Sequence, residues 1–246
     1  MVWGLVLPSG FGDGWPDGEF ESDPKYNEPG WFGRLKSHYL DQSPEVQRRL
    51  YGGQIADHAM GISSYVVGKI TREIGSRENQ HKPPFSPLEE HEPPRFFQTL
   101  RKHTDLCSII KLNSLIPAVD EDLKAIIEHL EPGVHQFYPL EIRLPAKKVY
   151  PKNYYTLVVG TFLDSFAFDQ TKPGSAHSPS PGRFNLNTTK KAMAGAAFRK
   201  VGFAGHHLWR ERTFWHDVLC FSEELHDAIV EAGLKMQRKF HQMAEV

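Results

Sequence analysis

The run Val218-Leu219-Cys220-Phe221-Ser222-Glu223-Glu224-Leu225 joins a short apolar segment to a helix-start signal. A serine oxygen can accept hydrogen bonds from the free amides of a first helical turn, and carboxylates are favoured at the positive end of the helix dipole. Leu225, Ala228 and Ile229 then recur at helical spacing. The run therefore predicts a strand that leads directly into a helix capped by Ser222.

A second run has the same order earlier in the chain. Val119-Asp120-Glu121-Asp122-Leu123 contains a strand end, a capping aspartate and an acidic first turn, followed by apolar residues at helical spacing, Leu123, Ile126, Ile127 and Leu130. Each predicted helix ends near a glycine, Gly133 or Gly233, and leads into a segment with an aromatic residue. The two runs predict a strand–capped helix–strand unit that occurs twice, and hence an α+β fold with a mixed or antiparallel sheet.

Other segments add further elements to this pattern. β-Branched and aromatic residues predict strands over five segments, Val2 to Leu7, Ile62 to Ile70, Leu115 to Val119, His135 to Leu144 and Tyr154 to Phe162. Ser43-Pro44-Glu45 predicts the start of a helix, because proline at the first helical position loses no hydrogen bond. Gly52-Gly53 predicts the end of that helix.

Prolines are concentrated between His81 and Pro94, among acidic residues. Proline cannot donate a backbone hydrogen bond, so this segment is expected to stay extended. It predicts a boundary between an N-terminal α+β region, residues 1–95, with a loop-rich start, and an α+β domain over residues 96–246. One continuous domain is the alternative, since 246 residues can bury a single large core.

The charge balance and the apolar runs exclude several classes of protein. Lys+Arg 29 against Asp+Glu 30 gives a formal net charge of -1, so no overall field attracts nucleic acid. No apolar run approaches the roughly twenty residues of a membrane-spanning helix, and the start lacks a secretory pattern. Cys107 and Cys220 stand among apolar residues, which favours buried thiols over a disulfide. We therefore expect a cytoplasmic protein whose partners are neither nucleic acid nor membrane.

The second half of the chain contains short elements whose order resembles one family. They are a capped helix start, a Gln-Phe-Tyr-Pro segment, a Tyr-Tyr strand, an aspartate-containing stretch, a His-Leu-Trp-Arg element and a Ser-Glu-Glu-Leu helix, at residues 119–123, 136–139, 154–155, 164–169, 207–210 and 222–225. Over about residues 104–240 the chain resembles the myxobacterial-type immunity proteins found beside polymorphic toxins in bacteria. The resemblance implies an immunity protein that binds and neutralises a cognate toxin by direct contact, without catalysis and without a cofactor. It leaves a homodimer open.

Aromatic and acidic residues indicate candidate partner-binding positions. Tryptophan and arginine supply large contact areas at low entropy cost, and an acidic loop could face a basic toxin cleft. Trp15 and Trp31 lie among glycine, proline and acidic residues, which favours exposure, although core packing uses tryptophan too. The candidate positions are Trp15, Asp17, Trp31, Asp164, Asp169, Trp209 and Arg210.

A hydrolase or metal-dependent enzyme is the alternative function. Asp164 and Asp169 could form an acid–base pair, since two carboxylates held close together shift each other's pKa values. They follow a predicted strand, where catalytic groups often lie. A third hypothesis is an adaptor that binds through Pro84-x-x-Pro87, a pattern that aromatic grooves recognise.

Histidines and serine offer further candidates for chemistry. His206 and His207 with Glu211 could hold zinc, yet adjacent residues on a strand point to opposite faces, and no HExxH or paired CxxC motif follows. Ser222 lacks the flanking glycines of a nucleophile elbow, which favours its interpretation as a helix cap. No metal or cofactor is therefore expected.

Overall fold

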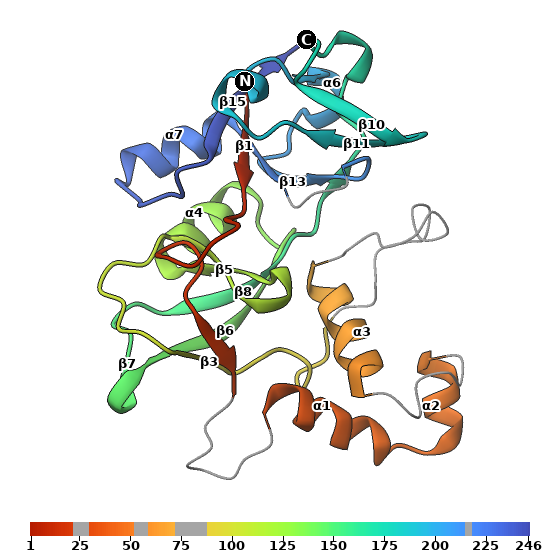
Figure 1. Cartoon of the computed structure of the whole chain (residues 1–246), viewed down its shortest axis with the longest axis vertical. Coiled ribbons are helices and arrows are strands. Elements are labelled where there is room, and N and C mark those ends of the chain that lie inside the picture. The colour runs from red at the N-terminus through yellow and green to blue at the C-terminus, as the bar shows by residue number, and fades with distance from the viewer. Residues whose placement is uncertain (22–29, 52–58, 72–87, 215–217) are drawn as a thin grey trace.

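The computed structural model describes residues 1–21, 30–51, 59–71, 88–214 and 218–246. Two β-sheets follow one another along the long axis of the molecule, and helices α4 and α7 contribute to the core between them (Figure 1). Helices α1, α2 and α3 lie beside the lower sheet (Figure 1). The arrangement confirms the predicted α+β class.

The lower sheet contains seven strands within the described residues and is mixed, since β3 and β6 are parallel while the other pairs are antiparallel. Across the sheet the order is β2 (Gly18–Phe20), β3 (Phe96–Thr99), β6 (Gln136–Leu144), β8 (Tyr154–Val158), β5 (Pro117–Asp120) and β4 (Ile109–Lys111), with β7 (Lys148–Val149) paired to β6.

The upper sheet contains six strands within the same described ranges, in the order β12 (Ala197–Phe198), β15 (Phe240–Glu245), β1 (Val2–Val6), β14 (Val218–Ser222), β13 (Leu208–Glu211) and β9 (Phe162–Leu163). The segment after β9 bridges to β12 at the opposite edge, where Ala167 N donates to Ala197 O and Arg199 N donates to Ser165 O, both at 2.8 Å. The upper sheet is therefore closed on itself. A separate hairpin is formed by β10 (Ala176–Ser180) and β11 (Arg183–Leu186).

The helices of the described residues differ greatly in length. They are α1 (Trp31–Leu40), α2 (Pro44–Tyr51), α3 (Ala59–Thr71), α4 (Glu121–Leu130), α5 (Lys190–Met193), α6 (Lys200–Phe203) and α7 (Glu223–Glu231), with 3₁₀ turns at Asn113–Leu115, Pro145–Lys147 and Phe168–Gln170. No described helix is long and apolar enough to cross a membrane.

The two predicted capped helices form as expected. Asp120 Oδ1 accepts a hydrogen bond from Leu123 N at 3.0 Å at the start of α4, and Ser222 Oγ accepts one from Leu225 N at 3.1 Å at the start of α7. In each case the strands before and after the helix pair with one intervening antiparallel strand, β8 in the first case and β1 in the second. The helices α4 and α7 also contact each other.

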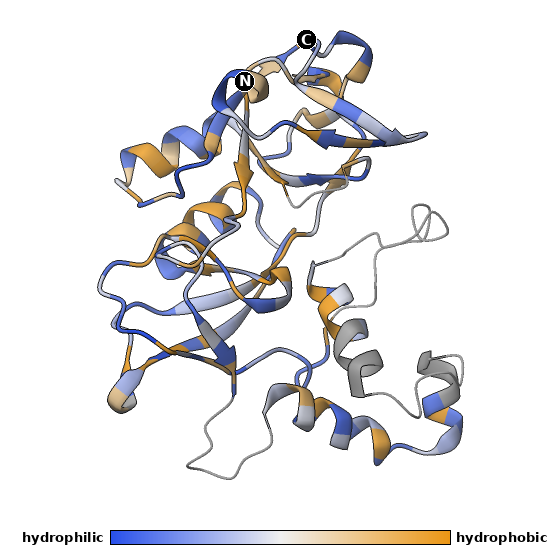
Figure 2. Cartoon of the chain, viewed as in Figure 1, coloured by the Kyte–Doolittle hydropathy of each residue, from blue (hydrophilic) through white to orange (hydrophobic). Residues whose placement is uncertain are grey.

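Alternating side chains of the central strands fill different cores. In β5, Val119 joins the core between the sheets and Ala118 joins the core below the lower sheet. In β14, Leu219 joins the core between the sheets and Cys220 joins the core enclosed by the upper sheet. Successive residues of a strand point to opposite faces, so a strand that is buried on both faces needs a continuous apolar run. In Figure 2 hydrophobic and hydrophilic residues alternate along α4 and α7, as in amphipathic helices that cover such a core.

The predicted strand from Ile62 to Ile70 is wrong, because this segment belongs to helix α3. Val66 and Ile70 are four residues apart and both are buried in the core of the lower sheet. Burial on one helical face outweighs the modest strand preference of β-branched residues. Lys69, on the same helix, is also buried and donates to both carboxylate oxygens of Glu92, at 2.7 and 2.5 Å.

The single strand predicted from Tyr154 to Phe162 is also wrong. The chain leaves the lower sheet after β8 and enters the upper sheet at β9. Gly160 lies at this crossing, where an added Cβ would approach the Val134 carbonyl oxygen to 1.8 Å. Only glycine permits such a close approach of two backbone segments.

The other predicted elements are confirmed with small shifts in their ends. Strands occupy most of residues 2–7 and 135–144, and the helix that begins at Pro44 has the Val46 amide donating to Ser43 Oγ at 3.3 Å. The strand predicted from Leu115 begins at Pro117. The predicted helix end at Gly52-Gly53 lies outside the described residues. So do Pro83, Pro84 and Pro87 of the proline-rich segment.

Candidate partner-binding site

The loop between β1 and β2 is closed by its own backbone. The Gly12 amide donates to the Trp15 carbonyl at 2.8 Å, and the Trp15 amide donates to the Gly12 carbonyl at 3.1 Å. These two bonds form an antiparallel bridge across Asp13 and Gly14. The loop therefore contains a defined turn at Asp13 and Gly14.

Neighbouring segments hold the inner part of this loop. The amides of Cys107, Lys111 and Leu100 donate to the carbonyls of Asp13, Gly14 and Asp17 at 3.0, 2.8 and 2.7 Å. A loop fixed at several points loses little conformational entropy on binding. Residues 12–17 are therefore already organised for contact with a partner.

Phe11 is the most prominent side chain of the loop. It is 57% exposed, and its ring centroid lies 4.6 Å from that of Trp15. Trp15 is half-buried, and the Lys111 ammonium lies 3.3 Å from its ring centroid. An added Cβ at Gly10 or Gly12 would meet nothing within 4 Å, so open space surrounds the Phe11 backbone. Phe11 was not among the predicted positions, although an aromatic residue between two glycines was the available signal.

Paired charges surround these aromatic rings. Lys235 Nζ lies 2.7 Å from a carboxylate oxygen of Asp13 and 2.7 Å from one of Asp105. Asp17 lies 3.9 Å from the Arg101 guanidinium. An apolar centre with a polar rim is the usual composition of a protein–protein interface.

A strained turn borders the same loop. Ser114 and Leu115 have φ values of 57° and 61°, a region that bulky side chains rarely adopt. Asn113 Nδ2 donates to the Gly18 carbonyl at 2.7 Å, which fixes the turn beside the loop. Backbone strain of this kind costs about 1–3 kcal/mol per residue and is concentrated at functional sites.

Two exposed leucines complete this region. Leu115 is 38% exposed on the strained turn, and Leu100 is 63% exposed next to Arg101. We call the region formed by Phe11, Trp15, Asp17, Leu100 and Leu115 the N-terminal surface. It contains two of the predicted partner-binding residues, Trp15 and Asp17, and adds three apolar ones.

Three other predicted partner-binding residues lie in the interior. Trp31 is completely buried in α1, and its indole Nε1 donates to the Glu92 carbonyl at 2.8 Å. Trp209 is completely buried in β13, and the neighbouring Arg210 is also buried. Trp31 and Trp209 are therefore part of the hydrophobic core. Core packing is the alternative that the sequence left open for tryptophan.

Asp164 and Asp169 are exposed, and each pairs with a different arginine. Arg212 donates to Asp164 at 3.1 Å, and Arg199 donates to Asp169 at 2.6 Å. Both aspartates are exposed to solvent. The two residues form separate surface ion pairs, which gives the acid–base hypothesis no support.

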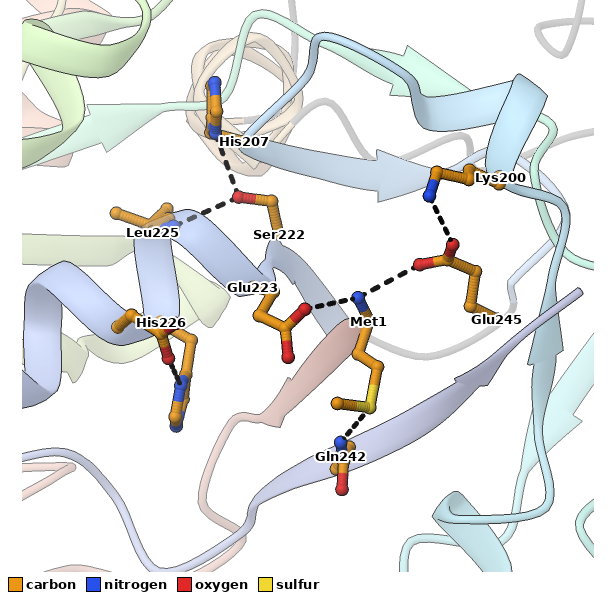
Figure 3. A network of polar contacts seen from close by, with 10 residues as sticks. Met1, Lys200, His207, Ser222, Glu223, Leu225, His226, Gln242 and Glu245 are labelled. Atoms are coloured by element: carbon orange, nitrogen blue, oxygen red, sulfur yellow. Dashed lines mark hydrogen bonds and ion pairs between the residues drawn. The ribbon is translucent and has the colours of Figure 1, made fainter.

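Ser222 contacts His207 in an arrangement that resembles part of a catalytic triad. Ser222 Oγ lies 2.9 Å from His207 Nδ1 (Figure 3). Glu224 Oε2 lies 3.7 Å from the same nitrogen. A triad places the serine and the carboxylate at opposite ring nitrogens. Because Ser222 also caps α7, its position follows from the helix start. Beside this contact, the Met1 amine forms ion pairs with Glu223 of α7 at 3.1 Å and with Glu245 of β15 at 3.0 Å.

Comparison with known proteins agrees with the predicted resemblance. The family model for an immunity protein family, Imm11, matches residues 54–244. The chain belongs to the Imm11 immunity protein family. The comparison with curated proteins found no match. The match begins well before residue 104, where the sequence resemblance was expected to start, and it leaves the loop at residues 9–17 outside the matched range. Membership in an immunity family favours a binding role over catalysis.

A buried carboxylate, Glu131, joins the two halves of this Imm11 protein. Glu131 Oε2 accepts from the Leu208 amide and lies 2.8 Å from His135 Nε2. His135 Nδ1 accepts from the Gly160 amide at 3.0 Å, so the imidazole proton is on Nε2 and donates to Glu131. His206 Nδ1 lies 3.6 Å from Glu131. Across the described ranges, no group of three or more His, Cys, Asp or Glu residues could hold a metal ion.

Glu211 is a second buried carboxylate, and it lies where the upper sheet of the Imm11 protein closes. It accepts hydrogen bonds from Trp209 Nε1 at 3.0 Å, from the Ser165 and Phe166 amides at 3.0 and 3.3 Å, and from the Ser165 hydroxyl. Burial raises the pKa of Glu211 to about 7, although the hydrogen bonds oppose this rise. In the sequence, Glu211 was a candidate zinc ligand together with His206 and His207. Its spacing of two from Trp209, on the same strand face, was the available signal for burial.

The raised pKa of Glu211 predicts a stability that falls between pH 4.5 and 7. In this window the folded protein holds a proton on Glu211 that the unfolded chain releases, so unfolding becomes easier as pH rises. The expected loss is about 3 kcal/mol, at 1.36 kcal/mol per pKa unit. Urea unfolding of wild type and Glu211→Gln at pH 5 and pH 8 measures it. A free-energy difference between the two proteins that is the same at both pH values would contradict this prediction.

Proposed function

We propose that this Imm11 protein neutralises one cognate bacterial toxin in the cytoplasm by direct contact through its N-terminal surface. Immunity families imply a toxin partner in general, and membership covers residues 54–244. The free, buried thiols of Cys107 and Cys220 are consistent with a reducing compartment.

One observation favours the N-terminal surface over other faces. Phe11 is exposed at the tip of a loop that the rest of the chain holds in place, and this loop precedes the range that the family model matches. Specificity for one toxin requires contacts that a shared family scaffold does not supply. A loop outside the shared range provides such contacts without changing the core.

The geometry suggests how the contact would neutralise the toxin. The Phe11 ring would enter an apolar depression of the toxin, while Leu100 and Leu115 would exclude water around it. The paired charges at Asp13, Asp17 and Lys235 would form the rim. Coverage of the toxin's active site by this surface would block access of its substrate, with no bond made or broken by the immunity protein.

Co-expression with the product of the neighbouring reading frame tests the proposal. We expect the chain to restore growth of cells that express this product and to co-purify with it as a defined complex. Light scattering of the complex then shows whether one copy of the chain or a homodimer is bound. Failure to restore growth, or restored growth without any complex, would overturn neutralisation by direct contact.

A further inference from the structure

Four exposed cations gather where α5 meets the start of β15. Lys190 and Lys191 form the first turn of α5, while Arg238 and Lys239 directly precede β15. α5 and β15 are in contact, and Lys239 Nζ lies 3.4 Å from Thr188 Oγ1. We call these four residues the basic patch.

No described carboxylate pairs with the basic patch. The sequence has no Asp or Glu from residue 170 to residue 210, and none from residue 232 to residue 244. Some other cations of the chain have carboxylate partners, as Lys200 has with Glu245 at 3.0 Å and Arg199 with Asp169 at 2.6 Å. The positive charge of the patch is therefore left uncompensated within the described part of the chain.

His241 responds to the field of the patch. Its pKa lies below the usual histidine value because of burial, then the charge of Lys190, with a smaller contribution from Lys239. Both lysines are thus close enough to disfavour protonation of His241. A carboxylate bound here would favour protonation and raise the His241 pKa.

The basic patch is continuous with the N-terminal surface through residues 235–239. Along this segment, Lys235 pairs with Asp13, Gln237 Nε2 donates to the Gly14 carbonyl at 3.4 Å, and the Lys239 carbonyl accepts from the Val6 amide at 2.9 Å. A partner bound to the loop would therefore lie beside the patch.

We propose that the basic patch binds an acidic segment of the toxin that the N-terminal surface contacts. The inference rests on the proposed function and adds the charge of the partner. Carboxylates of a protein fit better than a nucleic acid, because the chain has a formal net charge of -1 and the exposed faces of α4 and α7 are rich in Asp and Glu. A long polyanion would be repelled by those faces.

Charge reversal tests the basic patch. We expect Lys190→Glu/Lys239→Glu to weaken toxin binding about tenfold or more at low salt, and the loss to shrink as salt screens the contact. Lys36→Glu/Lys148→Glu is the matched control, since both lysines are exposed and the charge change is equal. Its affinity for the toxin should stay close to that of the wild type. In the wild-type complex, an NMR titration should show a raised His241 pKa.

Several outcomes would overturn this inference. If both double variants bind the toxin as tightly as the wild type does, and the wild type still protects cells, the patch is not part of the interface and the proposed function stands. A twelve-residue thymidine oligonucleotide tests the other partner. If it binds the wild type and not Lys190→Glu/Lys239→Glu, while this variant keeps the wild-type affinity for the toxin, the partner of the patch is a nucleic acid. If the wild type forms no complex with the toxin, both proposals fail.

Discussion

Replacing Phe11 by alanine is expected to weaken the complex with the cognate toxin about thirtyfold or more. Central aromatic residues of an interface commonly contribute 2 kcal/mol or more to binding, and about 1.4 kcal/mol corresponds to a tenfold change in Kd. Phe11 is 57% exposed, so its removal should leave folding almost unchanged. Isothermal titration calorimetry of both proteins with the toxin measures the effect, and urea unfolding verifies equal stability.

Phe168→Ala is the matched control for this experiment. Phe168 is 40% exposed and lies next to Asp169. Asp169 and Asp164 are predicted partner-binding residues that do not belong to the N-terminal surface. It should bind the toxin with nearly the affinity of the wild type. If Phe168→Ala weakens binding while Phe11→Ala does not, the interface lies near Asp164 and Asp169, and the N-terminal surface is the wrong face.

Replacing Lys69 by methionine is expected to lower the free energy of unfolding by about 3–5 kcal/mol. Lys69 and Glu92 form a fully enclosed ion pair, and loss of one partner leaves an uncompensated buried charge. Glu92 also accepts from the Tyr39 hydroxyl at 2.6 Å, so the pair connects α1, α3 and the segment that leads to β3. Urea unfolding followed by circular dichroism measures the loss.

The double variant Lys69→Met/Glu92→Gln should recover much of this loss. The glutamine oxygen can still accept from Tyr39, and no charge remains buried. Lys124→Met removes a surface ion pair with Glu128 and should cost less than about 1 kcal/mol. A Lys69→Met variant that is no less stable than Lys124→Met would show that the buried pair does not stabilise the packing of α1 and α3.

Features with a local cause could be predicted from the sequence. The caps at Asp120 and Ser222 depend on side chains within three residues of the amides they bind, and both form as expected. The short apolar runs before them correctly indicated strands. Helix α3 could not be recognised, because its burial depends on packing against a sheet most of whose strands come later in the chain.

Features that depend on distant contacts were beyond the sequence. The placement of β1 between β14 and β15 joins residues more than 200 positions apart. The burial of Glu92 and Glu131 depends on partners that only the folded chain brings near them.

Site-specific photo-crosslinking tests direct contact through the N-terminal surface most directly. The chain would carry p-benzoyl-phenylalanine in place of Phe11 or, as a control, in place of Val149, which is 56% exposed on β7. Each protein would be irradiated in complex with the toxin. Our account predicts a covalent product with the toxin from position 11 and none from position 149. A stable complex that crosslinks from position 149 and not from position 11 would contradict it.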